Sequence, residues 1–150
     1  GLAPQIRRFA DEGWEINLAI SLHAPQDELR SRLLPVNQRY PLAELLAACD
    51  YYTEKTHRRI SYEYALLRGV NDGPEQAAAL AQLLAGRLAH VNLIPVNFVA
   101  ETGFWPSNDE TLNQFAAALQ RQGIETTVRE KRGLDIDGAC GQLRRRQGES

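Results

Sequence analysis

The order of short apolar segments and amphipathic segments restricts the fold of this chain more than any other feature of its sequence. Runs with the length and pattern of β-strands lie at 16–22, 59–67, 90–95 and 124–129. Helical patterns precede and separate them at 2–12, 27–34, 42–55, 75–89 and from 107 or 108 to about 122. Strands that alternate with helices predict right-handed βαβ units. The sequence therefore predicts an α/β fold of about four parallel strands, either an open sheet or half of a barrel.

The length and composition are those of one globular domain. The chain has 150 residues, of which 43% are hydrophobic and 24% charged. No stretch approaches the roughly 20 apolar residues that cross a bilayer, so we expect a soluble protein with no membrane partner. The net charge of −2 is not that of a typical nucleic-acid-binding protein, so charge alone assigns no partner.

The chain begins with Gly1 and contains no methionine. Because an open reading frame begins with Met, we expect the chain to begin inside a longer protein; a processed start or a tag scar is the alternative. The two cysteines, Cys49 and Cys140, are too few for a disulfide framework and indicate a reducing, cytoplasmic setting.

Candidate ligand-binding residues follow the predicted strands. In parallel α/β folds, ligands bind at the carboxyl ends of strands. The first strand ends at Ser21, Leu22 and His23, and the third is followed by Asn97. Each has a structural alternative, since His23 suits a loop or a cap and Asn97 suits a turn. The sequence thus predicts a site at one edge of the sheet.

Three other side chains are candidates for chemistry. Cys140 lies outside the helix–strand alternation, and nearby glycines allow a ligand to approach the backbone closely, so its thiol is a candidate functional group. Cys49 lies on the apolar stripe of its helix and is predicted to pack in the core. Glu63 is predicted to be a paired or outward-facing carboxylate rather than a catalytic base.

Several motifs resemble, in collinear order, the dual-specificity RNA methyltransferases of the radical S-adenosylmethionine class. They span most of the chain: Ser21–Pro25, Asp27–Arg30, Leu34–Asn37, Tyr62–Leu66, Gly69–Asp72, Asn92–Asn97 and Asp135–Leu143. The resemblance implies methylation of C2 of an adenosine in large-subunit ribosomal RNA, and in some members of an adenosine in transfer RNA. A sister branch methylates C8.

The resemblance also implies a mechanism, because an aromatic amidine carbon is not nucleophilic and requires radical chemistry. In the family, one S-adenosylmethionine methylates a tail cysteine, and a second is cleaved at a 4Fe–4S cluster to a radical that activates the S-methyl group. Ser21, Leu22, His23 and Asn97 match S-adenosylmethionine contacts, and Cys140 matches the methyl-carrying cysteine. The implied partners are RNA and an electron donor for the cluster.

The family's cluster-binding CxxxCxxC motif is absent, so no metal ligand is predicted in this chain. We therefore expect residues 1–134 to be the C-terminal portion of the radical S-adenosylmethionine barrel and 135–150 to be a tail carrying the catalytic cysteine. Alone, the chain should be inactive, and an unpaired sheet edge should favour self-association. A non-catalytic half-barrel binding module and the C8-methylating sister enzyme are the alternatives.

Overall fold

The structure is a computed structural model that describes residues 3–13, 17–96 and 103–129. The helices are α1 (Ala3–Glu12), α2 (Asp27–Leu33), α3 (Val36–Arg39), α4 (Leu42–Thr56), α5 (Pro74–Leu84) and α6 (Asp109–Arg121). The strands are β1 (Ala19–Ser21), β2 (Ile60–Leu66), β3 (Ala89–Pro95) and β4 (Glu125–Val128). None of the helices in these ranges is long and apolar enough to cross a membrane.

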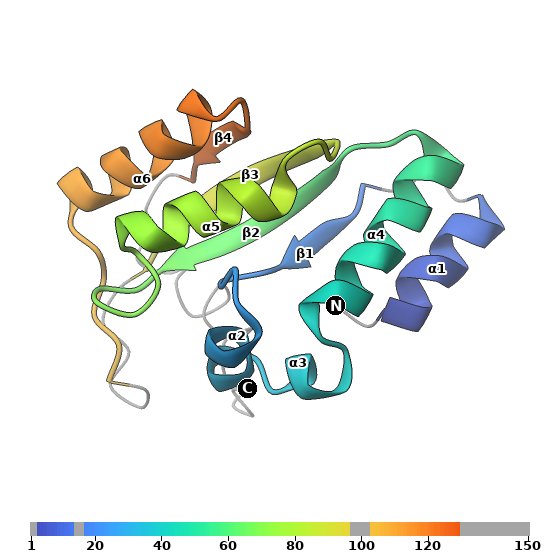
Figure 1. The fold of residues 1–150 in the computed structure, drawn as a ribbon, viewed down its shortest axis with the longest axis horizontal. Coiled ribbons are helices and arrows are strands. Elements are labelled where there is room, and N and C mark those ends of the chain that lie inside the picture. The colour runs from blue at the N-terminus through green and yellow to red at the C-terminus, as the bar shows by residue number, and fades with distance from the viewer. Residues whose placement is uncertain (1–2, 14–16, 97–102, 130–150) are drawn as a thin grey trace.

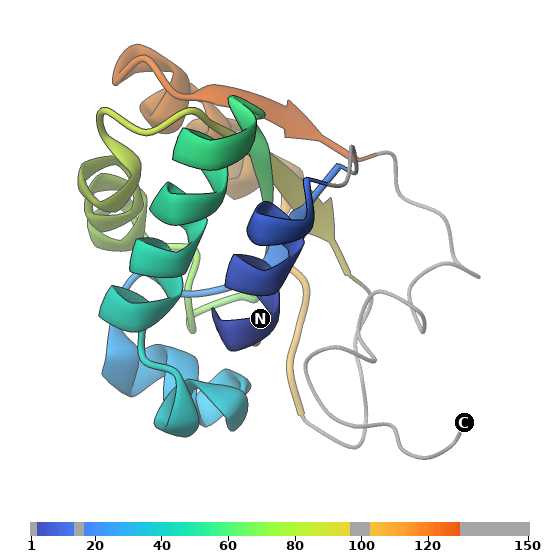
Figure 2. The same ribbon diagram turned by 90° about the vertical axis from the view of Figure 1, so that its right-hand side faces the viewer.

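The four strands form one parallel sheet in the order β1-β2-β3-β4 (Figure 1). Neighbours in the sheet are therefore also neighbours along the chain. Figure 2 shows α4 and α5 on the same side of the sheet. A doubly wound sheet reverses its strand order and places helices on both faces, whereas a barrel keeps one order with its helices outside. The arrangement is that of a barrel sector, which confirms the predicted α/β class and favours the half-barrel over the open sheet.

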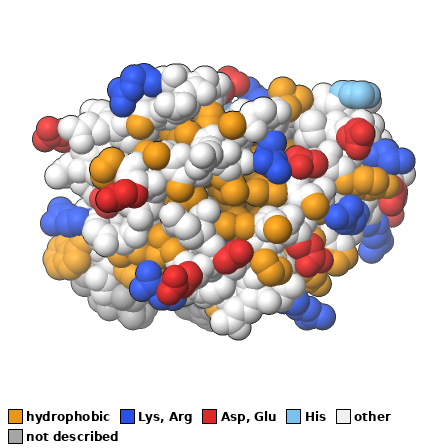
Figure 3. All heavy atoms as spheres, viewed as in Figure 1, with side chains coloured by type: hydrophobic (Ala, Val, Ile, Leu, Met, Phe, Trp, Pro, Cys, Tyr) orange, Lys and Arg blue, Asp and Glu red, His pale blue; other side chains and the backbone are white. Residues whose placement is uncertain are grey.

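The core lies between the sheet and the helices because strand residues alternate between its two faces. On β2, Ile60, Tyr62 and Tyr64 are buried against helical side chains, while Ser61 and Glu63 on the other face are only half-buried. A second cluster of buried side chains lies near the carboxyl ends of the strands: Ala24, Leu29, Leu33, Leu34, Ala65, Leu67, Ile94 and Val96. On the helical face, basic and acidic side chains are interspersed with hydrophobic atoms (Figure 3).

Apart from shifts of one or two residues at other bounds, the observed elements differ from the predicted ones in three places. The helix predicted at 75–89 ends at Leu84, because the chain turns through Gly86 with a φ of +78°. The first strand has only three residues, Ala19–Ser21, rather than the predicted 16–22. The four-residue helix α3 was not predicted, since so short an element has no detectable periodicity.

Candidate functional site

The carboxyl end of β1 closes in a tight turn centred on His23. The backbone N–H of Ala24 donates to the carbonyl oxygen of Leu22 at 2.8 Å, and His23 has a φ of +62°. A hydrogen bond between residues two apart around a positive φ is the pattern of a γ-turn, which is rare and strained. A non-glycine residue holds such a conformation only where its surroundings enforce it, and such residues cluster at functional sites.

Arg30 on α2 is the first of two buried side chains that hold this turn. Its guanidinium donates from Nη2 to the carbonyl of Ser21 at 2.8 Å and from Nε to that of Leu22 at 3.0 Å. Its third partner is Oδ1 of Asn37, which accepts from Nη1 at 2.9 Å. Arg30 is 0% exposed, and burial lowers its pKa to about 10, although Asp27 acts in the opposite direction. The cation thus remains charged at neutral pH and fixes two successive carbonyls.

Asn71 is the second buried side chain. Its Nδ2 donates to the carbonyl oxygens of His23 at 2.8 Å and Ala65 at 2.7 Å, and its Oδ1 accepts from the backbone N–H of Leu67 at 2.7 Å. The hydroxyl of Tyr64 donates to the Asn71 carbonyl at 2.8 Å. Asn71 therefore ties the end of β1 to the end of β2. Together with Arg30, it fixes the carbonyls of Ser21, Leu22 and His23, three of the four residues that the sequence predicted as cofactor contacts.

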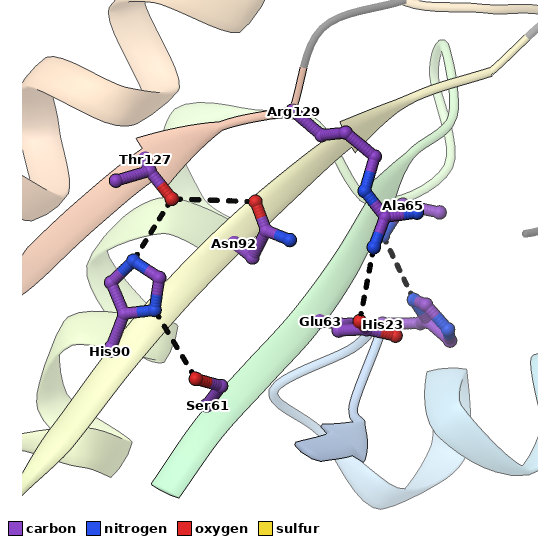
Figure 4. A network of polar contacts seen from close by, with 8 residues as sticks. All are labelled: His23, Ser61, Glu63, Ala65, His90, Asn92, Thr127 and Arg129. Carbon is purple, nitrogen blue, oxygen red and sulfur yellow. Dashed lines mark hydrogen bonds and ion pairs between the residues drawn. The ribbon is translucent and has the colours of Figure 1, made fainter. Parts of the chain in front are cut away.

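The imidazole of His23 is fully buried. Its Nδ1 accepts from the backbone N–H of Ala65 at 2.9 Å, so in the neutral ring the proton lies on Nε2 (Figure 4). Burial, followed by the charge of Arg30, lowers the pKa of His23 to about 3. Nε2 has no hydrogen-bond partner in the described part of the chain. His23 is thus a neutral donor held against the strand end and is unsuited to proton transfer at neutral pH.

The sheet face opposite the helices carries a chain of polar contacts across β2, β3 and β4 (Figure 4). His90 contacts Oγ of Ser61 through Nδ1 at 3.4 Å and Oγ1 of Thr127 through Nε2 at 2.9 Å. Thr127 in turn donates to Oδ1 of Asn92 at 3.4 Å. Partial burial, and then the charge of Arg59, lower the pKa of His90. This face is therefore polar, as expected for the interior of a barrel that holds a ligand.

Glu63 pairs with Arg129, whose Nη2 lies 3.3 Å from Oε2 (Figure 4). The ion pair confirms the prediction of a paired carboxylate. Cys49 is 1% exposed, and burial raises the pKa of its thiol to about 11, which confirms its assignment to the core. Asn97 and Cys140 lie outside the described residues, so their predicted roles stay predictions.

The cofactors implied by the sequence fit this edge unequally. A half-buried Ser21, a His23 Nε2–H that has no partner among the described residues, and a backbone held by hydrogen bonds suit the carboxylate and ribose oxygens of S-adenosylmethionine. An iron–sulfur cluster does not fit the described residues, since no three His, Cys, Asp or Glu side chains among them are grouped to hold a metal. The described residues therefore fit a cofactor site at this edge but do not supply the ligands of the cluster.

Comparisons with known proteins agree with this geometry. The chain is 56% identical over 146 residues to a probable dual-specificity RNA methyltransferase RlmN from Caldanaerobacter subterraneus subsp. tengcongensis. The aligned region covers 97% of this chain and 43% of that protein. A protein of the same name from Symbiobacterium thermophilum is 57% identical over 147 residues, or 97% of this chain and 40% of the relative. The chain is homologous to the dual-specificity RNA methyltransferases. It spans about two fifths of the length of these relatives.

Solved structures have a fold similar to that of this chain. The crystal structure of a radical SAM methyltransferase from Sphaerobacter thermophilus matches 96% of this chain and 42% of its own, with a TM-score of 0.88 and 51% identity. A domain of a pyruvate-formate lyase-activating enzyme from Bacteroides vulgatus shares the fold alone, with a TM-score of 0.51 and 16% identity. No protein-family model matches the chain. The resemblance to methyltransferases of the radical S-adenosylmethionine class is confirmed.

Sequence reasoning found the strand end but not the residues that hold it. Arg30, Asn37 and Asn71 all lie in the motifs that carry the methyltransferase resemblance, yet no role could be given to them. Their sequence neighbours are largely polar and gave no signal; only the structure shows that each of the three is at most 1% exposed. Buried polar side chains need partners. Arg30 and Asn71 take the carbonyls of the site, and Asn37 accepts a hydrogen bond from Arg30.

Proposed function

We propose that this chain is part of a radical S-adenosylmethionine methyltransferase that acts on RNA. The observation that carries the proposal is the turn at Ser21, Leu22 and His23, whose three carbonyls are held by Arg30 and Asn71 at the carboxyl edge of a parallel sheet. A strained turn held by buried side chains at that edge is typical of a ligand-binding site. The homology to methyltransferases identifies the ligand class.

In this proposal Ser21, Leu22, His23 and Asn97 contact S-adenosylmethionine. When bound, the cofactor supplies the methyl group and the radical chemistry that an unreactive aromatic carbon requires. His23 stays neutral and donates from Nε2, while Arg30 and Asn71 keep the turn in its bound shape without a change of conformation. Cys140 receives a methyl group on its sulfur and carries it to C2 of an adenosine in ribosomal RNA or transfer RNA.

In this proposal the 4Fe–4S cluster is held by other parts of the whole protein, and its electron donor is a separate partner. The chain contains only two cysteines, Cys49 and Cys140, and Cys49 is buried in the core. A cluster needs three or more thiolates in one place. Residues outside this chain must therefore supply them, and the 150 residues alone should not methylate RNA.

The test compares two cysteine variants of the full-length methyltransferase that carries this chain. Each is expressed in cells that lack their own enzyme, and methyladenosine from their RNA is measured by mass spectrometry. Cys140→Ala is expected to abolish the product, because the variant lacks the sulfur atom that carries the methyl group. Cys49→Ala, which removes a thiol from the core, is the matched control and should retain it.

The identity of the product separates the alternatives. 2-Methyladenosine from the wild type, lost only in Cys140→Ala, supports the proposal. 8-Methyladenosine would place the chain in the sister branch. Undiminished methyladenosine in Cys140→Ala would contradict the assigned role of Cys140, and no methylation in the wild type would favour a half-barrel that binds without catalysis.

A further inference from the structure

Trp105 is one of three large hydrophobic side chains that are exposed in the described part of the chain, with 54% of its surface accessible. It lies in the segment that leads into α6, beyond the carboxyl end of β2 (Figure 1). The other two are Leu88, just before the amino end of β3, and Val128 on the edge strand β4. Trp105 therefore presents a large apolar surface at the carboxyl edge of the sheet, where it can contribute to binding a partner.

The backbone around Trp105 is fixed to the end of β2. The backbone N–H of Arg68 donates to the Trp105 carbonyl at 2.8 Å, and Leu67 forms an antiparallel bridge with Pro106. Nε of Arg68 also donates to the Pro106 carbonyl at 3.2 Å. Because its backbone is already held in place, the indole can bind a partner at a small cost in conformational entropy.

Arg68 places a positive charge beside the segment that carries this ring, since its Nε contacts the Pro106 carbonyl. It is exposed, and within residues 3–13, 17–96 and 103–129 it takes part in no ion pair. Asp72, the acid nearest to it in sequence, accepts instead from the Gly69 N–H at 3.0 Å and the Ser107 hydroxyl at 2.6 Å. The guanidinium of Arg68 is therefore available for a phosphate, which it can bind with two donors.

We propose that Trp105 and Arg68 form an RNA-docking surface, in which a base stacks on the indole and the guanidinium binds the neighbouring phosphate. Single-stranded RNA is recognised in this way, by stacking on aromatic rings together with cationic contacts to its backbone. The inference rests on the proposed function and adds to it the place where nucleotides flanking the target adenosine bind.

The position of the surface fits this role. Arg68 lies two residues after the end of β2, and β2 pairs with β1, whose end carries the proposed cofactor contacts. A cavity of about 530 Å³ between α5 and α6 begins at Arg68 and continues past Thr111 and Gln114 to Arg121. These polar side chains extend the surface away from the edge, so an RNA strand with one base at the cofactor could continue along it.

The test measures RNA affinity and S-adenosylmethionine affinity separately in the full-length methyltransferase, with its RNA substrate as the probe. Trp105→Ala is expected to weaken RNA binding by about tenfold or more, since a single stacked base contributes roughly that much. Trp105→Phe should restore part of the affinity, because a phenyl ring still stacks. Arg68→Gln should reduce the dependence of RNA binding on salt by about one phosphate contact. Affinity for S-adenosylmethionine should be unchanged in all three.

The matched controls are Leu88→Ala and Arg87→Gln, which remove an exposed hydrophobic side chain and a cation from the opposite end of the sheet. Both should bind RNA as the wild type does. The proposal is overturned if Trp105→Ala binds RNA within twofold of Leu88→Ala. It is also overturned if Trp105→Ala loses S-adenosylmethionine affinity and stability together, because Trp105 then packs against another part of the protein. A wild type that neither binds nor methylates RNA would instead refute the proposed function.

Discussion

Replacing Asn71 with Ala is expected to destabilise the chain strongly. Asn71 is 0% exposed and makes three hydrogen bonds with the backbone groups of His23, Ala65 and Leu67. Leaving a buried backbone group without a partner costs about 1–3 kcal/mol. Local relaxation and a water molecule in the vacated space should recover part of this, so we expect a loss of about 3–5 kcal/mol. For a domain with a stability of about 5–15 kcal/mol, that is a large fraction.

Urea unfolding of the 150-residue chain, followed by circular dichroism, measures this loss. With a slope of about 2 kcal/mol per molar urea, the midpoint should fall by about 2 M with the slope unchanged. Asn92→Ala is the matched control, since Asn92 is half-buried and accepts one long hydrogen bond, from Thr127 at 3.4 Å. It should cost less than about 1 kcal/mol. Equal midpoints for the two variants would refute the claim that Asn71 holds the strand ends together.

Two other predictions concern buried titratable groups. Because the pKa of His23 is lowered to about 3 in the folded chain, the unfolded state binds a proton below about pH 6.5 while the folded state does not. The free energy of unfolding should therefore fall with acidification. Between pH 7 and 5 the wild type should lose about 2 kcal/mol more of it than His23→Asn does. Equal losses in both chains would refute the burial of a neutral ring. Cys49, with its pKa raised to about 11, should react with a thiol reagent in a Cys140→Ala background only as urea unfolds the chain. Rapid labelling of the folded chain would contradict its place in the core.

The sequence predicted most of the fold because the relevant signals are local. Alternation along β2 and the apolar stripe of α4 are visible within a few residues, and both elements end within one residue of their predicted bounds. The end of α5 was missed because Ala85 favours helix, whereas the positive φ of Gly86 stops it. Local patterns therefore predict where an element exists better than where it ends.

The site was only partly predictable for a different reason. The rule that ligands bind at carboxyl ends of parallel strands located Ser21, Leu22 and His23 without any tertiary information. The contacts that hold them join residues far apart in sequence: Asn71 reaches His23 over 48 positions and Arg30 reaches Ser21 over nine. Neither pairing has a local sequence pattern. Both form only when α2 and the turn after β2 pack against the end of β1.

The most direct test of the central claim, that this chain carries the methyl group in a radical methyltransferase, is the mass of its Cys140 peptide. The full-length protein is purified from cells, digested with trypsin, and the peptide 133–144 compared with the peptide 40–55 that contains Cys49. We predict an added methyl group on the sulfur of Cys140 in a substantial fraction of molecules, and none on Cys49. An unmodified Cys140 in protein that is active in RNA methylation would contradict this role.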